Sequence, residues 1–307
     1  MSSTTGDAVL PVTSTPAVAS LERAGKQAKK RLTSRTSSLI AILLAVLWTA
    51  PTFGLLATSF RPKADIDDNG WWNVFTHPTF TLDNYREALS SSSGGLGTNF
   101  INSIVITIPA VLIPISLAAL AAYAFAWIDF KGRDLLFVAV FALQIVPIQV
   151  TLIPLLTLYV DAGLNGTFWT IWLSHTMFGL PLAIFLLHNF MKEIPRELIE
   201  AARMDGAGHI QIFFRVLMPL LTPALAAFAI FQFLWVWNDL LVALTFAGGT
   251  PDLAPLTVSL ANLSGTQGTA WQLLSAGAFI SLAIPVIVFL SLQRFFVRGL
   301  LAGGLKG

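Results

Sequence analysis

The sequence contains no cysteine and few charged residues. Of its 307 residues, 11% are Asp, Glu, Lys or Arg, whereas an average soluble domain has about 25%. So few charges cannot cover the surface of a water-soluble domain of this size. The absence of cysteine excludes a disulfide framework, thiolate chemistry and cysteine-ligated metal centres. Hydrophobic residues make up 55% of the chain, which excludes a disordered protein. The composition indicates a polytopic membrane protein.

Common catalytic patterns are also missing. The sequence has no Gly-x-x-x-x-Gly-Lys-Ser/Thr phosphate loop, no His-Glu-x-x-His zinc motif and no Gly-x-Ser-x-Gly nucleophile motif. Its four histidines are too scattered to suggest a metal site, and no basic-aromatic groove suggests nucleic-acid binding. We therefore expect neither an enzyme nor a chain with a cofactor of its own.

Six apolar segments are long enough to cross a bilayer, which requires about 20 helical residues. They cover residues 39–57, 100–127, 135–159, 168–187, 223–246 and 273–292. Helices are expected because lipid offers no hydrogen-bond partner to the backbone. Prolines within nearly every segment predict kinks, which suit a bundle that moves or encloses a cavity. The predicted fold is all-α, with six transmembrane helices.

The distribution of Lys and Arg predicts the orientation. Fifteen of the 18 lie before the first span, around Gly132, between spans four and five, or after span six. By the positive-inside rule, these regions and both termini are cytoplasmic. We expect residues 1–36 to be a disordered basic tail and residues 37–307 to be the transmembrane domain. A cleavable signal peptide ending near Ala57 is the alternative, although its removal leaves an odd number of spans.

The loop between spans four and five, residues 193–219, carries the most specific pattern. Pro195 suits the first turn of a helix, and Gly206 is placed to end that helix with a positive φ. A second apolar stretch, residues 210–218, follows and stops at Pro219. We predict a short helix, a sharp glycine turn and a second helix at the cytoplasmic surface.

The spacing of Glu200-Ala201-Ala202, Gly206, Val216 and Met218-Pro219 resembles the EAA loop of ABC-importer permeases. The family pattern has Ile and Leu where this chain has Val216 and Met218. The resemblance implies the type I ABC importer permease fold and a coupling helix that docks into a separate ATPase subunit. The coupling residues that it implies are Glu200, Ala201, Ala202, Asp205, Gly206 and Ala207.

Further stretches resemble the MalG-type permeases of carbohydrate uptake. They are Thr81–Tyr85, Asn102-Ser103, Phe130–Arg133, Trp237–Asp239 and Gln293–Gly307. The loop at residues 65–72 resembles the α-glucoside subgroup. The end of the chain resembles a tail that inserts between two ATPase subunits, with a basic end that contacts nothing as the alternative. The residues implied in that contact are Gly303, Gly304, Lys306 and Gly307.

Five polar or aromatic residues in predicted spans are candidates for lining a sugar path. Aromatic faces pack on sugar C–H groups, whereas amides and carboxylates bind hydroxyls. Asp239 is the only carboxylate in a predicted span, so the relay of charges that an ion-coupled carrier usually needs is missing. A structural cap or a helix contact is the favoured alternative, because MalG-type systems hold the sugar mainly in the partner permease. The candidates are Trp237, Asn238, Asp239, Gln144 and Gln149.

The resemblance implies one of two permease subunits of an ABC sugar importer in a bacterial cytoplasmic membrane. The implied partners are a MalF-type permease, two copies of a MalK-like ATPase that carries ATP-Mg, and an extracellular solute-binding protein. α-Glucosides such as maltose or trehalose are the leading substrates, and other oligosaccharides or polyol conjugates remain open. A stand-alone ion-coupled carrier and a membrane assembly protein are the competing interpretations, and the EAA spacing argues against both.

Overall fold

The computed structural model describes residues 35–90, 95–247, 249–266 and 270–304. The predicted basic tail, residues 1–36, lies almost wholly outside this described part. The chain divides into two units, residues 1–55 and 56–307. The boundary falls within α2 (Arg35–Ser59), which is long and apolar enough to cross a membrane. Because its apolar side chains lie on all sides, α2 matches a helix embedded in lipid or in another protein.

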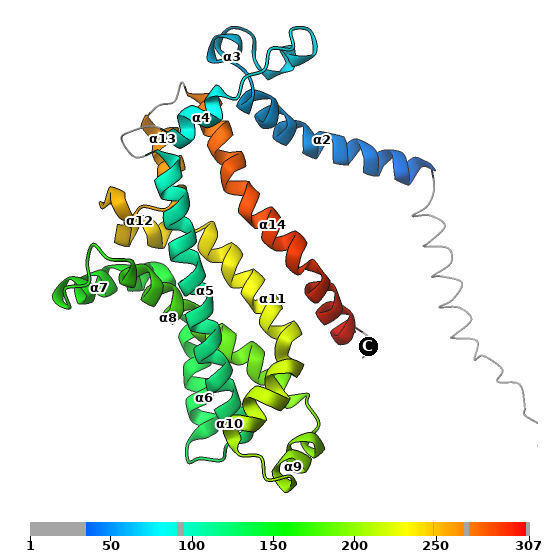
Figure 1. The fold of residues 1–307 in the computed structure, drawn as a ribbon, viewed down its shortest axis with the longest axis vertical. Helices are drawn as coiled ribbons and strands as arrows, with labels where there is room; N and C mark the ends of the chain where they lie inside the picture. The colour runs from blue at the N-terminus through cyan, green and yellow to red at the C-terminus, as the bar shows by residue number, and fades with distance from the viewer. Residues whose placement is uncertain (1–34, 91–94, 248, 267–269, 305–307) are drawn as a thin grey trace, which may run out of the picture. The chain divides into compact units, whose positions relative to one another are not determined.

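Four long helices form the core of the second unit (Figure 1). They are α5 (Leu96–Trp127), α8 (Phe168–Lys192), α11 (Met218–Trp237) and α14 (Trp271–Gly304). α5 packs along α8, and α11 packs against α5, α8 and α14. Small residues line the interior, and Ala118, Ala122 and Ala183 are fully buried. Small side chains let helix backbones approach closely, which is how helices associate in lipid.

The third predicted span is broken rather than straight. It consists of α6 (Arg133–Ala142), η2 (Leu143–Ile145) and α7 (Ile148–Asp161), and the two halves are bent by 100°. Proline disfavours the helical conformation in the residue before it, and Val146 is extended with φ −71° and ψ 120° ahead of Pro147. The span predicted over residues 135–159, for which its prolines predict a kink, is thus two helices joined at a sharp bend. The described residues contain five continuous apolar helices of spanning length, or six spans if the bent pair counts as one.

The fifth span also differs from its prediction. One helical stretch runs from His209 to Trp237, through α10 (His209–Gln211), the π-helical turn η3 (Ile212–Leu217) and α11. Pro219 does not end it: the π-helical turn η3 leads directly into α11, and Pro219 is the second residue of α11. The chain instead breaks after Trp237 and resumes as α12 (Leu241–Ala247).

Short elements lie at the end of the second unit where α5 and α14 begin, which we call the α13 end (Figure 1). They are α3 (Lys63–Asn69), η1 (Trp71–Phe75), α4 (Asp83–Ser90), η4 (Pro251–Leu253) and α13 (Leu256–Thr266). Side chains tie these elements together: Asn84 Nδ2 donates to the carbonyls of Ser59 and Arg61, and Asn102 Nδ2 donates to the carbonyl of Asp252. Asn84 and Asn102, which belong to the stretches that resemble MalG-type permeases, thus hold the short elements together at this end.

Candidate functional site

The loop after α8 folds as a helix that ends in a glycine turn. α9 (Arg196–Met204) follows Pro195, with Glu197 in its first turn and Arg203 in its last. Those charges stabilise the two ends of the helix dipole. Gly206 has φ +82°, and the N–H groups of Gly206 and Ala207 donate to the carbonyls of Arg203 and Ala202 at 3.0 and 2.9 Å. This is the Schellman arrangement, and it confirms the predicted positive φ at Gly206.

α9 is anchored to the bundle along one face. Ile199 is 2% exposed and belongs to the same buried cluster as Leu187, Phe213 and Leu217. Ala202 and Ala207 pack against that cluster. Beyond the turn, Tyr123 Oη and His209 Nδ1 are hydrogen-bonded at 2.7 Å, which fixes α10 to α5. Both arms of the turn therefore connect rigidly to long helices.

The opposite face of the turn is exposed. Glu200, Ala201, Asp205 and Gly206 are all exposed. Three large apolar side chains near them also face outward: Leu198, Met204 and Ile210, with Met204 83% exposed. Exposed apolar groups beside small residues are typical of a surface that another protein covers. The structure thus brings the predicted coupling residues together around one turn at the α9 end of the bundle, the end that holds α9 and α10 (Figure 1).

The break after α11 holds three of the candidate sugar-path residues. Trp237 is 3% exposed, and its Nε1 donates to the carbonyl of Ser281 at 3.0 Å. Asp239 caps α12, because its carboxylate accepts the N–H groups of Val242 and Ala243 at 3.3 and 2.9 Å. Capping by Asp explains why the predicted helix over residues 223–246 is interrupted here.

Asp239 also lies beside a buried histidine. His175 Nε2 is 3.7 Å from Asp239 Oδ2, and both side chains are almost inaccessible. Trp237 and Asp239 therefore make interior contacts in this conformation. Asn238 is exposed and donates to the carbonyl of Leu234 at 2.7 Å.

The other two candidates, Gln144 and Gln149, flank the 100° bend between α6 and α7, and both are exposed. Within the described residues, no hydrogen bond connects either glutamine to Asn238 or Asp239. The sugar path stays a prediction. At the end of the chain, Gly303 and Gly304 belong to α14, which continues 12 residues past its predicted end at 292, while Lys306 and Gly307 lie outside the described residues.

An interior glutamine was missed by sequence reasoning. Gln232 is 1% exposed and its Nε2 donates to the carbonyls of Ala110 and His175 at 3.2 and 3.4 Å. It bridges α5, α8 and α11 where Gly179 leaves room, since a Cβ at Gly179 would lie 2.7 Å from Gln232 Oε1. A lone glutamine in an apolar segment was the available signal.

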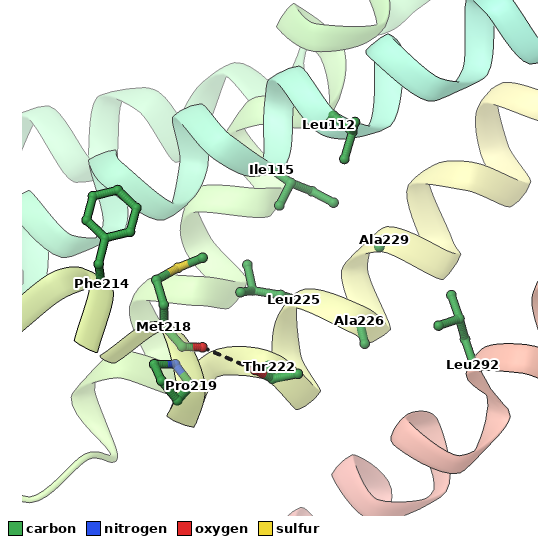
Figure 2. Close-up of a pocket in the computed structure, with 10 residues that line it drawn as sticks. All are labelled: Leu112, Ile115, Phe214, Met218, Pro219, Thr222, Leu225, Ala226, Ala229 and Leu292. Atoms are coloured by element: carbon green, nitrogen blue, oxygen red, sulfur yellow. Dashed lines mark hydrogen bonds between the residues drawn. The ribbon is translucent and has the colours of Figure 1, made fainter. Parts of the chain in front are cut away.

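An apolar groove of about 710 Å³ opens between α5, η3, α11 and α14. Figure 2 shows Leu112, Phe214 and Leu292 at its sides and the Thr222 hydroxyl turned back to the carbonyl of Met218. Because that hydroxyl is already bonded at 3.2 Å, the groove offers few partners for sugar hydroxyls. It suits an apolar occupant instead.

Comparison with known proteins identifies the family. Residues 115–301 match the family described as binding-protein-dependent transport system inner membrane component. The chain is 55% identical over 272 residues to the osmoprotective compounds uptake permease protein GgtD of Synechocystis sp., covering 87% of this chain and 91% of that relative. It is 53% identical over 242 residues to the alpha-glucoside transport system permease protein AglG of Rhizobium meliloti, covering 77% of this chain and 63% of that relative.

Solved structures agree on the fold. A chain of the bacterial ABC transporter that imports the acidic polysaccharide alginate superposes with a TM-score of 0.68 at 22% identity, covering 86% of this chain and 98% of that one. A likeness at this identity establishes the architecture, which is that of type I ABC importer permeases. This protein is accordingly a multi-pass membrane permease, and it belongs to the family of binding-protein-dependent transport system inner membrane components.

Proposed function

We propose that this chain is a permease subunit of an ATP-driven importer that moves a sugar of the α-glucoside class into the cell. The observation that carries the proposal is the exposed Schellman turn at Gly206, formed by residues with the spacing of the EAA loop. The 53% identity to an alpha-glucoside permease supports the substrate class. Small osmolytes such as polyol conjugates are the second candidate, because another relative at 55% identity is named for osmoprotective compounds.

In this proposal the exposed residues around the turn dock on an ATPase subunit. Glu200, Ala201 and Asp205 form the outward face, and Ile199 transmits force to the bundle because it is packed in the core. The Tyr123–His209 hydrogen bond connects the second arm of the turn to α5. Closure of two ATPase subunits would thus move α5 and α11 together and open the pathway toward one side of the membrane.

The orientation follows from charge. Lys131, Arg133, Lys192 and Arg203 all lie at the α9 end of the bundle, which by the positive-inside rule supports a cytoplasmic location for that end. The α13 end then faces outward, toward a solute-binding protein. The two chain termini are cytoplasmic in this arrangement.

The remaining parts of the proposal concern partners. The chain pairs with a MalF-type permease and with two copies of a MalK-like ATPase, which bind ATP-Mg, so this subunit needs no cofactor of its own. Gly303, Gly304, Lys306 and Gly307 approach the ATPase pair. Absence of a phosphate loop from the sequence supports the placement of ATP hydrolysis on another chain.

The test is uptake of radiolabelled maltose, trehalose and a polyol glucoside by cells that express this chain with its co-encoded transport subunits. We expect uptake that survives collapse of the proton and sodium gradients by ionophores and stops when ATP is depleted. A purified complex should hydrolyse ATP faster when the sugar-loaded binding protein is added. Gradient-dependent uptake by this chain alone would instead identify a secondary carrier.

A further inference from the structure

A polar cavity of about 240 Å³ lies where α9 meets the ends of three apolar helices. Trp127 ends α5, Arg133 begins α6 and Lys192 ends α8, and all three line the cavity. Residues at the ends of membrane-spanning segments lie at the depth of the lipid headgroups. The opposite wall of the cavity is α9, through Arg196, Ile199, Glu200 and Arg203.

The cavity has an excess of positive charge. Arg133 is paired with two carboxylates, because its Nη1 is 2.7 Å from Asp129 Oδ1 and its Nε is 3.0 Å from Asp134 Oδ1, so these three residues together carry one negative charge. The other cations that line the cavity come from α8 and α9: Lys192, Arg196 and Arg203. Among the described residues, none of these three forms an ion pair. Against them stand Glu200, the remaining carboxylate of the lining, and the net negative charge of the Asp129–Arg133–Asp134 group, which leaves an excess of one positive charge.

A buried donor beside the cavity also lacks a partner. The indole Nε1 of Trp127 is inaccessible and finds no acceptor in the described part of the chain. Buried N–H groups are almost always hydrogen-bonded, because an unpaired donor is destabilising. The wall of the cavity therefore holds cations without ion pairs, and one lining residue, Trp127, carries a donor without a partner that reaches a bound oxygen-rich anion once the indole turns toward the cavity.

We propose that this cavity binds the phosphate of an anionic phospholipid headgroup. A lipid fits better than a free phosphate because the start of α6 presents exposed apolar side chains to the acyl chains: Leu135 is 76% exposed and Leu136 is exposed beside it. Anionic lipids are attracted to basic pockets between helices on the cytoplasmic side, so the inference rests on the proposed orientation. A bound headgroup braces α9 against the ends of α5 and α8, which makes the position of the turn dependent on lipid charge.

The test is a titration of the purified full-length chain in detergent with phosphatidylglycerol or phosphatidylcholine, followed by native mass spectrometry. One double variant removes two cavity cations, through Lys192→Gln and Arg203→Gln. The control double variant, Lys131→Gln with Arg215→Gln, removes two exposed cations at the same end of the bundle but outside the cavity. We expect phosphatidylglycerol to bind the unmodified chain more tightly than phosphatidylcholine. Each lost cation should weaken that binding roughly fivefold, so about 25-fold for the cavity pair, with less than about twofold for the control pair.

Trp127→Phe separates the cavity from general surface charge, because it removes the N–H donor without altering any charge. We expect severalfold weaker binding of phosphatidylglycerol and unchanged binding of phosphatidylcholine. Circular dichroism of each variant checks that the helices remain formed.

Three outcomes overturn the proposal. Equal losses in the two double variants would show diffuse attraction, and competition by millimolar inorganic phosphate without any preference between the lipids would show a soluble-anion site. The cavity would have a protein occupant if a complex purified with an ATPase excluded phosphatidylglycerol and its cavity residues cross-linked to that ATPase. Failure of ATP-driven uptake leaves this result unaffected, because lipid binding is measured on the chain alone.

Discussion

Replacement of Gly206 by alanine tests the turn through which we propose that an ATPase moves this protein. Gly206 has φ +82°, and a Cβ built there meets no atom within 4 Å. The cost of Gly206→Ala is therefore conformational rather than steric, and a left-handed conformation costs a non-glycine residue about 1–2 kcal/mol. That cost is small against a folding stability of roughly 5–15 kcal/mol, so the chain should still insert and fold.

The local effect is larger than the global one. A penalty of about 1–2 kcal/mol lowers the population of the Schellman turn by a factor of roughly 5–30 relative to competing loop conformations. Gly206→Asn should restore much of that population, because Asn tolerates the left-handed region. We expect Gly206→Ala to reduce sugar uptake several-fold at unchanged membrane abundance, and Gly206→Asn to retain most of the uptake.

The matched control is Gly163→Ala, because Gly163 also has a positive φ, +68°, and open space around it, but it lies between α7 and α8. Immunoblots of membrane fractions give abundance, and initial rates of labelled-sugar uptake give activity. The reasoning is refuted if the Ala and Asn variants at position 206 lose uptake equally. It is also refuted if abundance falls in proportion to uptake, or if the control loses as much.

Three further predictions concern packing and capping. Ile199→Ala should destabilise the protein by about 2–5 kcal/mol, because Ile199 is packed in the core. Leu198→Ala, at a half-exposed position, should change thermal unfolding in detergent little. Comparable losses in the two variants would show that α9 is not anchored through Ile199. Asp239→Ala should cost about 0.5–2 kcal/mol through loss of the α12 cap, and hydrogen exchange should rise at the amides of α12 alone. Gly179→Ala should cost about 1–3 kcal/mol by crowding Gln232, and Gln232→Ala in the same chain should relieve that crowding; a strictly additive double variant would exclude the contact.

The helical architecture could be predicted because its cause is local and repeated. Long apolar runs require helices in lipid, and the Pro195–Gly206 spacing determines where α9 begins and ends. These features depend on residues close together in the chain. The positive φ at Gly206 was therefore accessible from sequence.

The breaks in spans three and five were not predictable from hydropathy, because apolar content continues across both. At Pro147 the pre-proline restriction separates α6 from α7, but Pro109 and Pro114 lie within α5 without interrupting it. Local sequence does not distinguish these cases, since neighbouring helices decide whether freed backbone groups are satisfied. Asp239 was considered as a sugar contact, yet its position as the cap of α12 depends on where α11 stops.

The polar contacts between helices were the hardest part to foresee. The side chain of Gln232 donates hydrogen bonds to carbonyls on α5 and α8. The polar cavity lined by Trp127 brings together residues from α5, α6, α8 and α9. Each requires knowledge of helix packing that one sequence does not contain. In the sequence, Lys192, Arg196 and Arg203 contributed to the predicted orientation of the chain, but their spacing did not predict a shared cavity.

The most direct test of the coupling claim uses the absence of cysteine from the sequence. Ala201→Cys places a unique thiol on the exposed face of the turn, and Asn165→Cys places one on the exposed loop between α7 and α8. A thiol-to-amine cross-linker should join Cys at position 201, and not at position 165, to a nucleotide-hydrolysing subunit in transport-active membranes. Active uptake with no such cross-link from position 201 would contradict the account.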